Sequence, residues 1–181
     1  MLASIFGFEV KNVRSFTGHD GPGYLQGTLY YAGKRIGTWS QDAWCGPDHF
    51  FLDTGHEEEY YENIAKKAYH SYLNNKGSRS SHSFHLYESP YWSLETLMMD
   101  LCTLKELESL LKKGKKQGYG CLIRLVNLTT HADVVGYLPT LTKENVRVFT
   151  NLHGAKVDNN YVVELYTKLA DFKVAVPVLN K

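Results

Sequence analysis

Aromatic segments separated by glycine-containing turns fill the N-terminal part of the chain, and this pattern constrains the fold most strongly. Four such segments follow one another, at residues 8–16, 23–31, 34–41 and 49–53. The turn at 32–34 reads Ala-Gly-Lys, which is typical of a tight hairpin because glycine tolerates a positive φ. Turn-forming residues also fill 17–23 and 43–47. We therefore expect an antiparallel β-meander of four strands at the N-terminus.

A helix is expected directly after the meander. Residues 54–57, Thr-Gly-His-Glu, have the spacing of a capping box, and apolar residues at helical spacing follow them. The helix should end near 74–77, where asparagine and glycine suit a left-handed cap. A serine-rich loop at 78–83 then predicts a boundary between a first domain, residues 1–77, and a second domain, residues 84–181.

The second domain is expected to hold a helical hairpin followed by a β-rich subdomain. One helix opens at Ser89-Pro90, and a second capping box at 103–106 indicates a separate helix that stops at Gly114. Strands are expected at 119–128, 134–138, 161–166 and 172–176. Thr142 can cap a short helix through Leu152, although residues 146–149 would also suit a strand. Strands and helices that are segregated in this way indicate an α+β fold.

Composition limits the functional classes. The chain has 181 residues, 43% of them hydrophobic and 22% charged, which is ordinary for a globular protein. A net charge of +1 excludes a strong overall attraction to nucleic acid, so any such contact must come from a local patch. The three cysteines form no CxxC pair, and no apolar run reaches the ~20 residues of a membrane span. We expect a soluble cytoplasmic protein with reduced thiols and no membrane contact.

The loop at 18–23 carries the first set of candidate site residues. Its glycines would present His19 and Asp20 at a strand end, where the imidazole can act as general acid or base and the carboxylate can orient it. Arg14, Lys34 and Arg35 could bind a phosphate if the meander brings them close. These groups would suffice for RNA cleavage without a metal, because the ribose 2′-hydroxyl is itself the nucleophile. The alternative is an Asx turn at Asp20 beside an exposed histidine.

An acidic and histidine-containing stretch at 48–59 is the second candidate. Asp48, His49, Asp53, His56 and Glu57 offer oxygen and imidazole ligands for a divalent metal. The spacing does not match HExxH, and strand alternation places residues 48 and 49 on opposite faces. Acids in a first helical turn are also explained by the helix dipole. We therefore expect no cofactor and treat a divalent metal as the weaker alternative.

A compact basic cluster is the third candidate, formed by Lys112, Lys113, Lys115 and Lys116. Cations at a helix C-terminus are stabilising by themselves. The functional alternative is a contact with an RNA backbone or with an acidic protein partner.

Several segments carry a resemblance to a known group of proteins. They are the turn Ser-Phe-x-Gly-x-x-Gly-x-Gly-Tyr at 15–24, the hairpin Leu-Tyr-Tyr-x-Gly-Lys-x-Ile-Gly at 29–37, the Gly-Pro turn at 46–47 and the segment Val-Glu-Leu-Tyr-x-x-Leu-x-Asp-Phe at 163–172. With them the chain resembles anti-CRISPR inhibitors of Cas9 carried by phages and mobile elements of Gram-positive bacteria.

The resemblance implies a protein of the host bacterial cytoplasm whose partners are Cas9, its guide RNA, or both. Two hypotheses follow. The first is a ribonuclease-like inhibitor that shortens the guide RNA, with His19 as acid–base residue, Asp20 orienting it and His49 as a second acid. The second is a non-catalytic protein that occludes Cas9 or its guide through exposed tyrosines and the lysine cluster. A phage accessory protein unrelated to CRISPR is the remaining alternative.

Overall fold

A computed structural model describes residues 2–17, 23–42, 46–74, 93–127, 129–130, 132–153 and 161–175. Within these residues the chain forms three α-helices and nine strands in two sheets, which confirms the predicted α+β class. The chain divides into two compact units. The meander unit comprises residues 3–76, 90–104 and 173–181, and the three-stranded unit comprises residues 1–2, 77–89 and 105–172. The predicted boundary loop at 78–83 lies outside the described residues, so the division into 1–77 and 84–181 stays a prediction.

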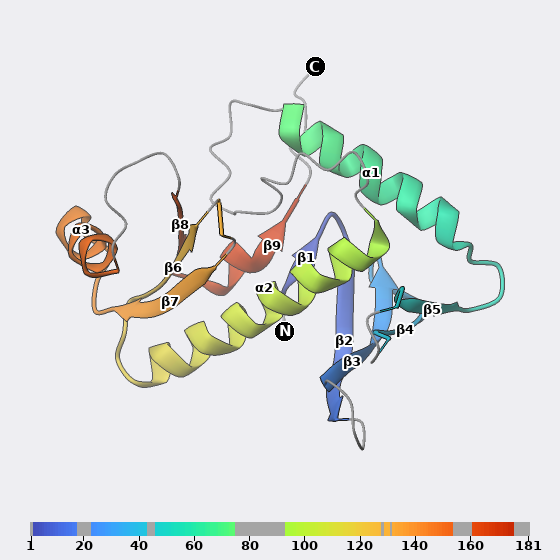
Figure 1. The fold of residues 1–181 in the computed structure, drawn as a ribbon, viewed down its shortest axis with the longest axis horizontal. Coiled ribbons are helices and arrows are strands. Elements are labelled where there is room, and N and C mark those ends of the chain that lie inside the picture. Colours follow the sequence, from blue (N-terminus) through green and yellow to red (C-terminus); the bar gives the residue numbers. More distant parts are fainter. Residues whose placement is uncertain are drawn as a thin grey trace. The chain divides into compact units, whose positions relative to one another are not determined.

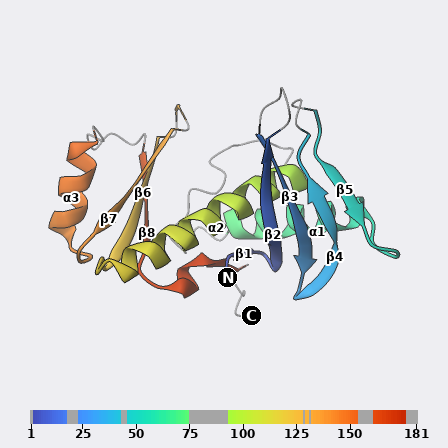
Figure 2. The same ribbon diagram turned by 90° about the horizontal axis from the view of Figure 1, so that it is seen from below.

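The meander unit is built on a six-stranded sheet. Its strands are β1 (Ser4–Ile5), β2 (Phe8–Thr17), β3 (Gly23–Tyr31), β4 (Lys34–Ser40), β5 (His49–Leu52) and β9 (Lys173–Val174), in the order β5-β4-β3-β2-β1-β9. Strands β2 to β5 are consecutive antiparallel neighbours, as the sequence predicted (Figure 2). Ala32 and Gly33 both have positive φ, 49° and 78°, which suits the tight β3–β4 hairpin. Strand β1 and its parallel pairing with β9 were not predicted, because two-residue strands carry no periodic signal.

One face of this sheet is buried against helix α1 (Glu58–Asn74). The buried face carries apolar side chains that are at most 5% exposed, namely Phe8, Val10, Leu29, Ile36 and Trp39. Tyr61 of α1 packs edge-on against Phe8 and Tyr31, with ring centroids 6.2 and 5.6 Å apart. The predicted capping box at Thr54 is wrong, because Thr54 and Gly55 form a turn and α1 begins only at Glu58.

Helix α2 (Leu94–Lys116) is a single helix of 23 residues. The predicted break at 103–106 is therefore wrong, as is the stop at Gly114, which lies two residues before the end of α2. The reason is the apolar stripe, which continues at helical spacing through the predicted break. Its buried leucines are Leu94, Leu97, Leu101, Leu104, Leu107 and Leu111.

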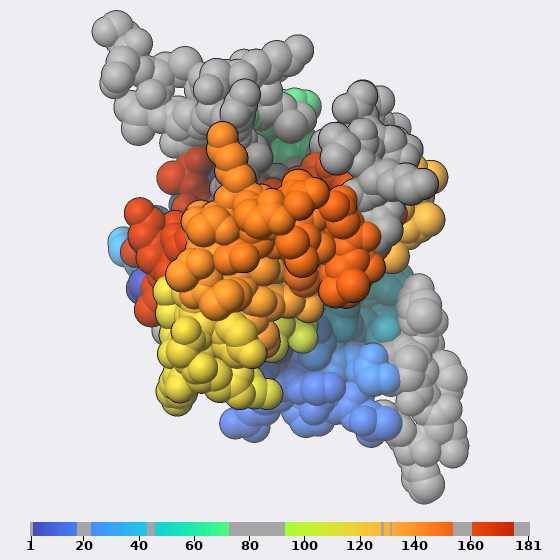
Figure 3. Space-filling view, turned by 90° about the vertical axis from the view of Figure 1, so that its left-hand side faces the viewer, coloured from blue at the N-terminus to red at the C-terminus, as the bar shows by residue number. Residues whose placement is uncertain are grey.

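The three-stranded unit is built on β6 (Cys121–Asn127), β7 (Asp133–Leu138) and β8 (Tyr161–Tyr166), with β6 in the centre. Helix α3 (Lys143–Leu152) lies beside this sheet and places Val146 and Phe149 on its apolar cluster, which resolves the helix–strand alternative (Figures 1 and 3). The Oγ1 of Thr142 accepts a hydrogen bond from the Asn145 amide at 3.1 Å, so the predicted cap is confirmed. A 3-10 turn, η1 (Leu169–Phe172), follows β8.

Candidate nucleic-acid interface

The second face of the meander sheet carries exposed and half-buried polar, basic and aromatic side chains, and we call it the open face. Strand register assigns its members, because side chains alternate along a strand and paired residues point to the same side. The open face comprises Glu9, Lys11, Arg14, Phe16, Tyr24, Gln26, Thr28, Tyr30, Arg35, Thr38, Ser40, His49 and Phe51.

A polar row crosses four strands in the middle of the open face. Arg14 of β2 pairs with Gln26 of β3, Gln26 with Ser40 of β4, and Ser40 with His49 of β5. The Gln26 Nε2 donates a hydrogen bond to the Ser40 Oγ at 3.2 Å. The row therefore presents a guanidinium, an amide, a hydroxyl and an imidazole in register.

Aromatic rings flank this polar row on both sides. Phe16 and Tyr24 pair across β2 and β3, and their rings stack with centroids 5.4 Å apart and an interplanar angle of 20°. On the other side of the row lies Phe51, which is 65% exposed. Phe16 is itself 37% exposed. These exposed rings offer planar surfaces on which nucleobases can stack.

A β-bulge brings two cations to the same face. Lys11 and Arg14 are three residues apart and would point to opposite faces of a regular strand. The register of β2 against β3 shifts between them, and Asn12 has a φ of 52°. The bulge therefore returns both cations to the open face. Asparagine tolerates this conformation better than most residues, and it is the one sequence signal that could have predicted the bulge.

Arg14 lies in a shallow groove of about 510 Å³, which Gln26, Ser40 and Phe51 also line. Lys11 lies over the Tyr30 ring at 4.1 Å and pairs with Glu9 at 3.1 Å. Among the residues that the structure describes, no carboxylate forms an ion pair with Arg14. Its guanidinium is thus the cation of the open face that is best placed to contact a phosphate.

Lys34 and Arg35 do not join Arg14. They lie at the β3–β4 turn, where Arg35 pairs with Tyr30 and Lys34 with Tyr31. These partners are four to five residues along β3 from Gln26, the partner of Arg14, which is about 14–17 Å at the usual rise per residue. Arg35 forms an ion pair with Asp53, with the Nη1 3.1 Å from the Oδ2. The three basic residues of the predicted phosphate site are therefore divided between the middle of the open face, where Arg14 lies, and the β3–β4 turn, where Lys34 and Arg35 lie.

His49 shares the polar row with Arg14 but lies at its other end. Three strand spacings separate their backbones, which is about 14 Å. His19 and Asp20 lie outside the described residues. His49 is consequently the one predicted acid–base residue that the structure describes, and it lies at the opposite end of the polar row from Arg14.

The lysine cluster lies at the C-terminal end of α2, in the three-stranded unit. Lys112 pairs with the fully buried carboxylate of Glu108 at 2.5 Å, and Lys115 donates to the Gly120 carbonyl at 2.7 Å. Lys113 and Lys116 are exposed. Two of the four lysines therefore have a structural role, and two are accessible to a partner.

The stretch at 48–59, which was the weaker metal-binding alternative, forms no metal site within the described residues. In the described part of the chain, no group of three or more histidine, cysteine, aspartate or glutamate side chains is arranged to hold a metal ion. The Asp48 carboxylate accepts a hydrogen bond from the indole of the buried Trp39 at 2.6 Å, whereas His49 belongs to the open face. Burial raises the pKa of Asp48.

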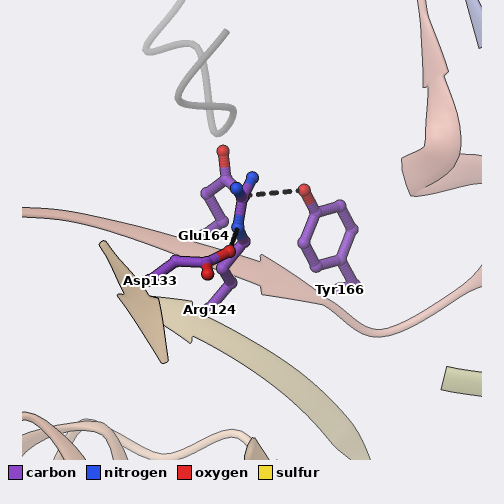
Figure 4. A network of polar contacts seen from close by, with 4 residues as sticks. All are labelled: Arg124, Asp133, Glu164 and Tyr166. Carbon is purple, nitrogen blue, oxygen red and sulfur yellow. Dashed lines mark hydrogen bonds and ion pairs between the residues drawn. The ribbon is translucent and has the colours of Figure 1, made fainter. Parts of the chain in front are cut away.

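A buried ion network in the three-stranded unit holds a second cluster of charged groups (Figure 4). Arg124 of β6 contacts Asp133 at 2.6 Å and the fully buried Glu164 at 3.2 Å. The Tyr166 hydroxyl also donates to Glu164, at 2.9 Å. Burial lowers the pKa of Arg124, but the two carboxylates outweigh it, so that the pKa is raised overall. Arg124 offsets the charge of the buried Glu164 carboxylate, which is the arrangement of a structural network.

A comparison with protein-family models, with curated proteins and with solved structures found no match to this chain in any of the three. In the part of the chain that the structure describes, no helix has the length and apolar character needed to cross a membrane.

Proposed function

We propose that the protein binds single-stranded RNA across the open face of its meander sheet, and that this RNA is the guide RNA of Cas9. The polar row flanked by exposed rings carries the proposal. Single-stranded nucleic acids bind to surfaces that combine stacking rings with cations along the backbone path, and sequence-specific RNA recognition uses exposed sheets in this way. The identity of the RNA rests on the sequence resemblance to inhibitors of Cas9.

Each group of the open face has a distinct role in this proposal. Phe16 and Phe51 stack on bases, and Arg14 contacts a phosphate between them. Gln26 and Ser40 can donate and accept hydrogen bonds at a base edge or at the ribose 2′-hydroxyl. A net charge of +1 gives little general attraction to RNA, so a contact with Cas9, to which Lys113 and Lys116 can contribute, would add affinity for the bound guide.

Binding without cleavage is the mode that this geometry favours. Cleavage through the 2′-hydroxyl needs a base and an acid within hydrogen-bond reach of one phosphodiester. Shortening of the guide remains a second candidate, because His19 and Asp20 follow Thr17 in the chain, at the end of β2 where Phe16 lies.

Incubation of labelled guide RNA with the protein, with and without Cas9, tests the proposal on native and denaturing gels. Full-length RNA of retarded mobility supports binding. A discrete shorter RNA supports cleavage, and His19→Ala, Asp20→Ala and His49→Ala variants, with EDTA in parallel, then identify the groups responsible. Intact RNA of unchanged mobility in both conditions contradicts RNA binding.

Aromatic substitutions locate the RNA on the open face. Phe16→Ala and Phe51→Ala should each weaken binding by about five-fold or more, since stacking on one ring contributes about 1–3 kcal/mol. Tyr119→Ala is the matched control, because Tyr119 is 38% exposed but lies in the three-stranded unit. Equal losses in all three variants would place the RNA elsewhere.

A further inference from the structure

A second pocket of the meander unit lies at the beginning of α1, away from the open face. It has a volume of about 410 Å³ and is lined by Gly55, His56, Glu57, Tyr60 and Tyr61. We call it the α1 pocket. None of these residues belongs to the RNA surface proposed above.

Three rings form the walls of the α1 pocket. Tyr60 and Tyr61 have centroids 5.2 Å apart and an interplanar angle of 80°, so they form two walls at nearly a right angle. The His56 ring lies 5.7 Å from Tyr61. A hydrogen bond of 2.5 Å between the Tyr61 hydroxyl and the His56 Nδ1 fixes these two rings. Two of the three walls, His56 and Tyr61, are therefore held in place before any ligand arrives.

Tyr60 contributes little to the core. It is 59% exposed, whereas its neighbour Tyr61 is 4% exposed and packs against the sheet. The exposed position leaves a tyrosine ring beside a carboxylate, that of Glu57, at the rim of the same pocket. Aromatic faces attract cations through their quadrupole, and a carboxylate adds a charge of the right sign.

The charges around the pocket are predominantly negative. Glu58 and Glu59 follow Glu57 directly, and among the described residues no lysine or arginine forms an ion pair with these three. The pKa of Glu58 is raised by burial and by the neighbouring carboxylates of Glu62 and Glu95. The positive end of the helix dipole accounts for acids at this position, but it does not account for the three rings.

From these rings and the adjacent carboxylate, we infer that the α1 pocket binds an alkylammonium group. The cation lies against the exposed Tyr60 ring, and Glu57 neutralises its charge. The group can belong to a lysine side chain of a partner protein or to a free polyamine, which present the same chemistry to the pocket.

NMR titration of the full chain tests this inference with four probes: N-acetyl-lysine methylamide, spermidine, choline and 3,3-dimethylbutanol. The last is the neutral isostere of choline. The ammonium probes should shift the resonances of Gly55, His56 and Tyr60, and choline should bind more tightly than its isostere. Equal binding of choline and 3,3-dimethylbutanol would overturn the inference, as would shifts located elsewhere. A preference for spermidine over the lysine derivative indicates a polyamine as the source, and the reverse preference indicates a protein partner.

Variants distinguish the contribution of the Tyr60 ring to binding from that of the Glu57 charge and from any effect on folding. Tyr60→Ala should weaken binding of the ammonium probes by about five-fold, as expected for the loss of one exposed cation–π contact, and Glu57→Gln should weaken it as well. Tyr60→Phe keeps the ring and should retain binding. Tyr119→Ala is the matched control, because Tyr119 is also an exposed tyrosine, at 38%, but lies in the three-stranded unit. Unchanged affinity in Tyr60→Ala would refute the role of the rings.

Discussion

Removal of the Arg124 guanidinium, which contacts the fully buried Glu164, should destabilise the protein strongly. The Arg124→Met variant keeps most of the apolar stem but removes the cation that lies 3.2 Å from the buried Glu164 carboxylate. Breaking a buried ion pair from one side costs about 3–5 kcal/mol. We expect the lower end, about 3 kcal/mol, because the Tyr166 hydroxyl still donates to Glu164. The contact with Asp133 adds little, since that carboxylate is 39% exposed.

Urea denaturation followed by far-UV circular dichroism measures this loss. With a slope of about 2 kcal/mol/M, the midpoint should fall by about 1.5 M. The matched control is Arg147→Met, which breaks the exposed pair with Glu144 on α3 and should leave the midpoint unchanged. Hydrogen exchange of β6 and β8 peptides would show that the loss is local to the three-stranded unit.

A double variant distinguishes an unpaired charge from lost packing. Arg124→Met combined with Glu164→Met removes both charges, and replacement of a buried pair by apolar residues is often neutral. The double variant should therefore be more stable than Arg124→Met alone. If Arg124→Met matched the Arg147→Met control, or if the double variant were the less stable of the two, the reasoning about the buried network would be refuted.

Three further predictions concern other parts of the fold. Gly136→Ala should lower the free energy of unfolding, measured by thermal melting, by about 1–3 kcal/mol, because the new Cβ would lie 2.3 Å from the Phe149 Cε2. Gly23→Ala is the control and should be nearly neutral, because its Cβ meets only an ordinary contact at 3.6 Å. Thr142→Ala should lower the free energy of unfolding by about 1 kcal/mol, because it removes the cap of α3, whereas Thr142→Ser keeps the hydroxyl and should retain the stability. Equal melting temperatures of the two variants would contradict the role of the hydroxyl. Burial, with Asp100 and Tyr72 adding to it, raises the pKa of Tyr69 to about 12. The unfolded phenol loses its proton near pH 10 and the folded one only near pH 12, so this contribution to stability is present below pH 10 and lost as the pH rises to 12. Urea midpoints measured between pH 9 and pH 11.5 should therefore fall less steeply in Tyr69→Phe than in the parent, and parallel curves would contradict the shift.

The local pattern of the sequence was sufficient to predict most strands. Alternation and the Ala32-Gly33 turn define β3 and β4 almost to the residue, because each hairpin signal lies within a few positions of the strands it joins. The helix boundaries were harder. Capping-box spacing at 54–57 and 103–106 occurs without a helix start in both places, since the tertiary packing of Tyr61 and of the leucine stripe decides where the helices lie.

The candidate site was predictable only in part. Arg14 and His49 were recognised by residue type, but their shared row depends on the bulge at Asn12 and on the pairing of four strands. The exposed rings of Phe16 and Phe51 were not predicted as site residues. Alternation alone does not say which face of a strand the helices cover, and this choice decides whether an aromatic residue is core or surface.

The salt dependence of RNA binding by Arg14 variants tests the central claim most directly. Fluorescence anisotropy of a labelled single-stranded RNA, measured over a series of KCl concentrations, gives the slope of log Kd against log salt. If Arg14 contacts a phosphate, Arg14→Ala should reduce the magnitude of this slope by about 0.7, the value for one contact with single-stranded nucleic acid. Lys34→Ala, which removes an exposed cation at the far end of β3, should leave the slope unchanged. An unchanged slope in Arg14→Ala, or an equal decrease in both variants, would contradict RNA binding on the open face.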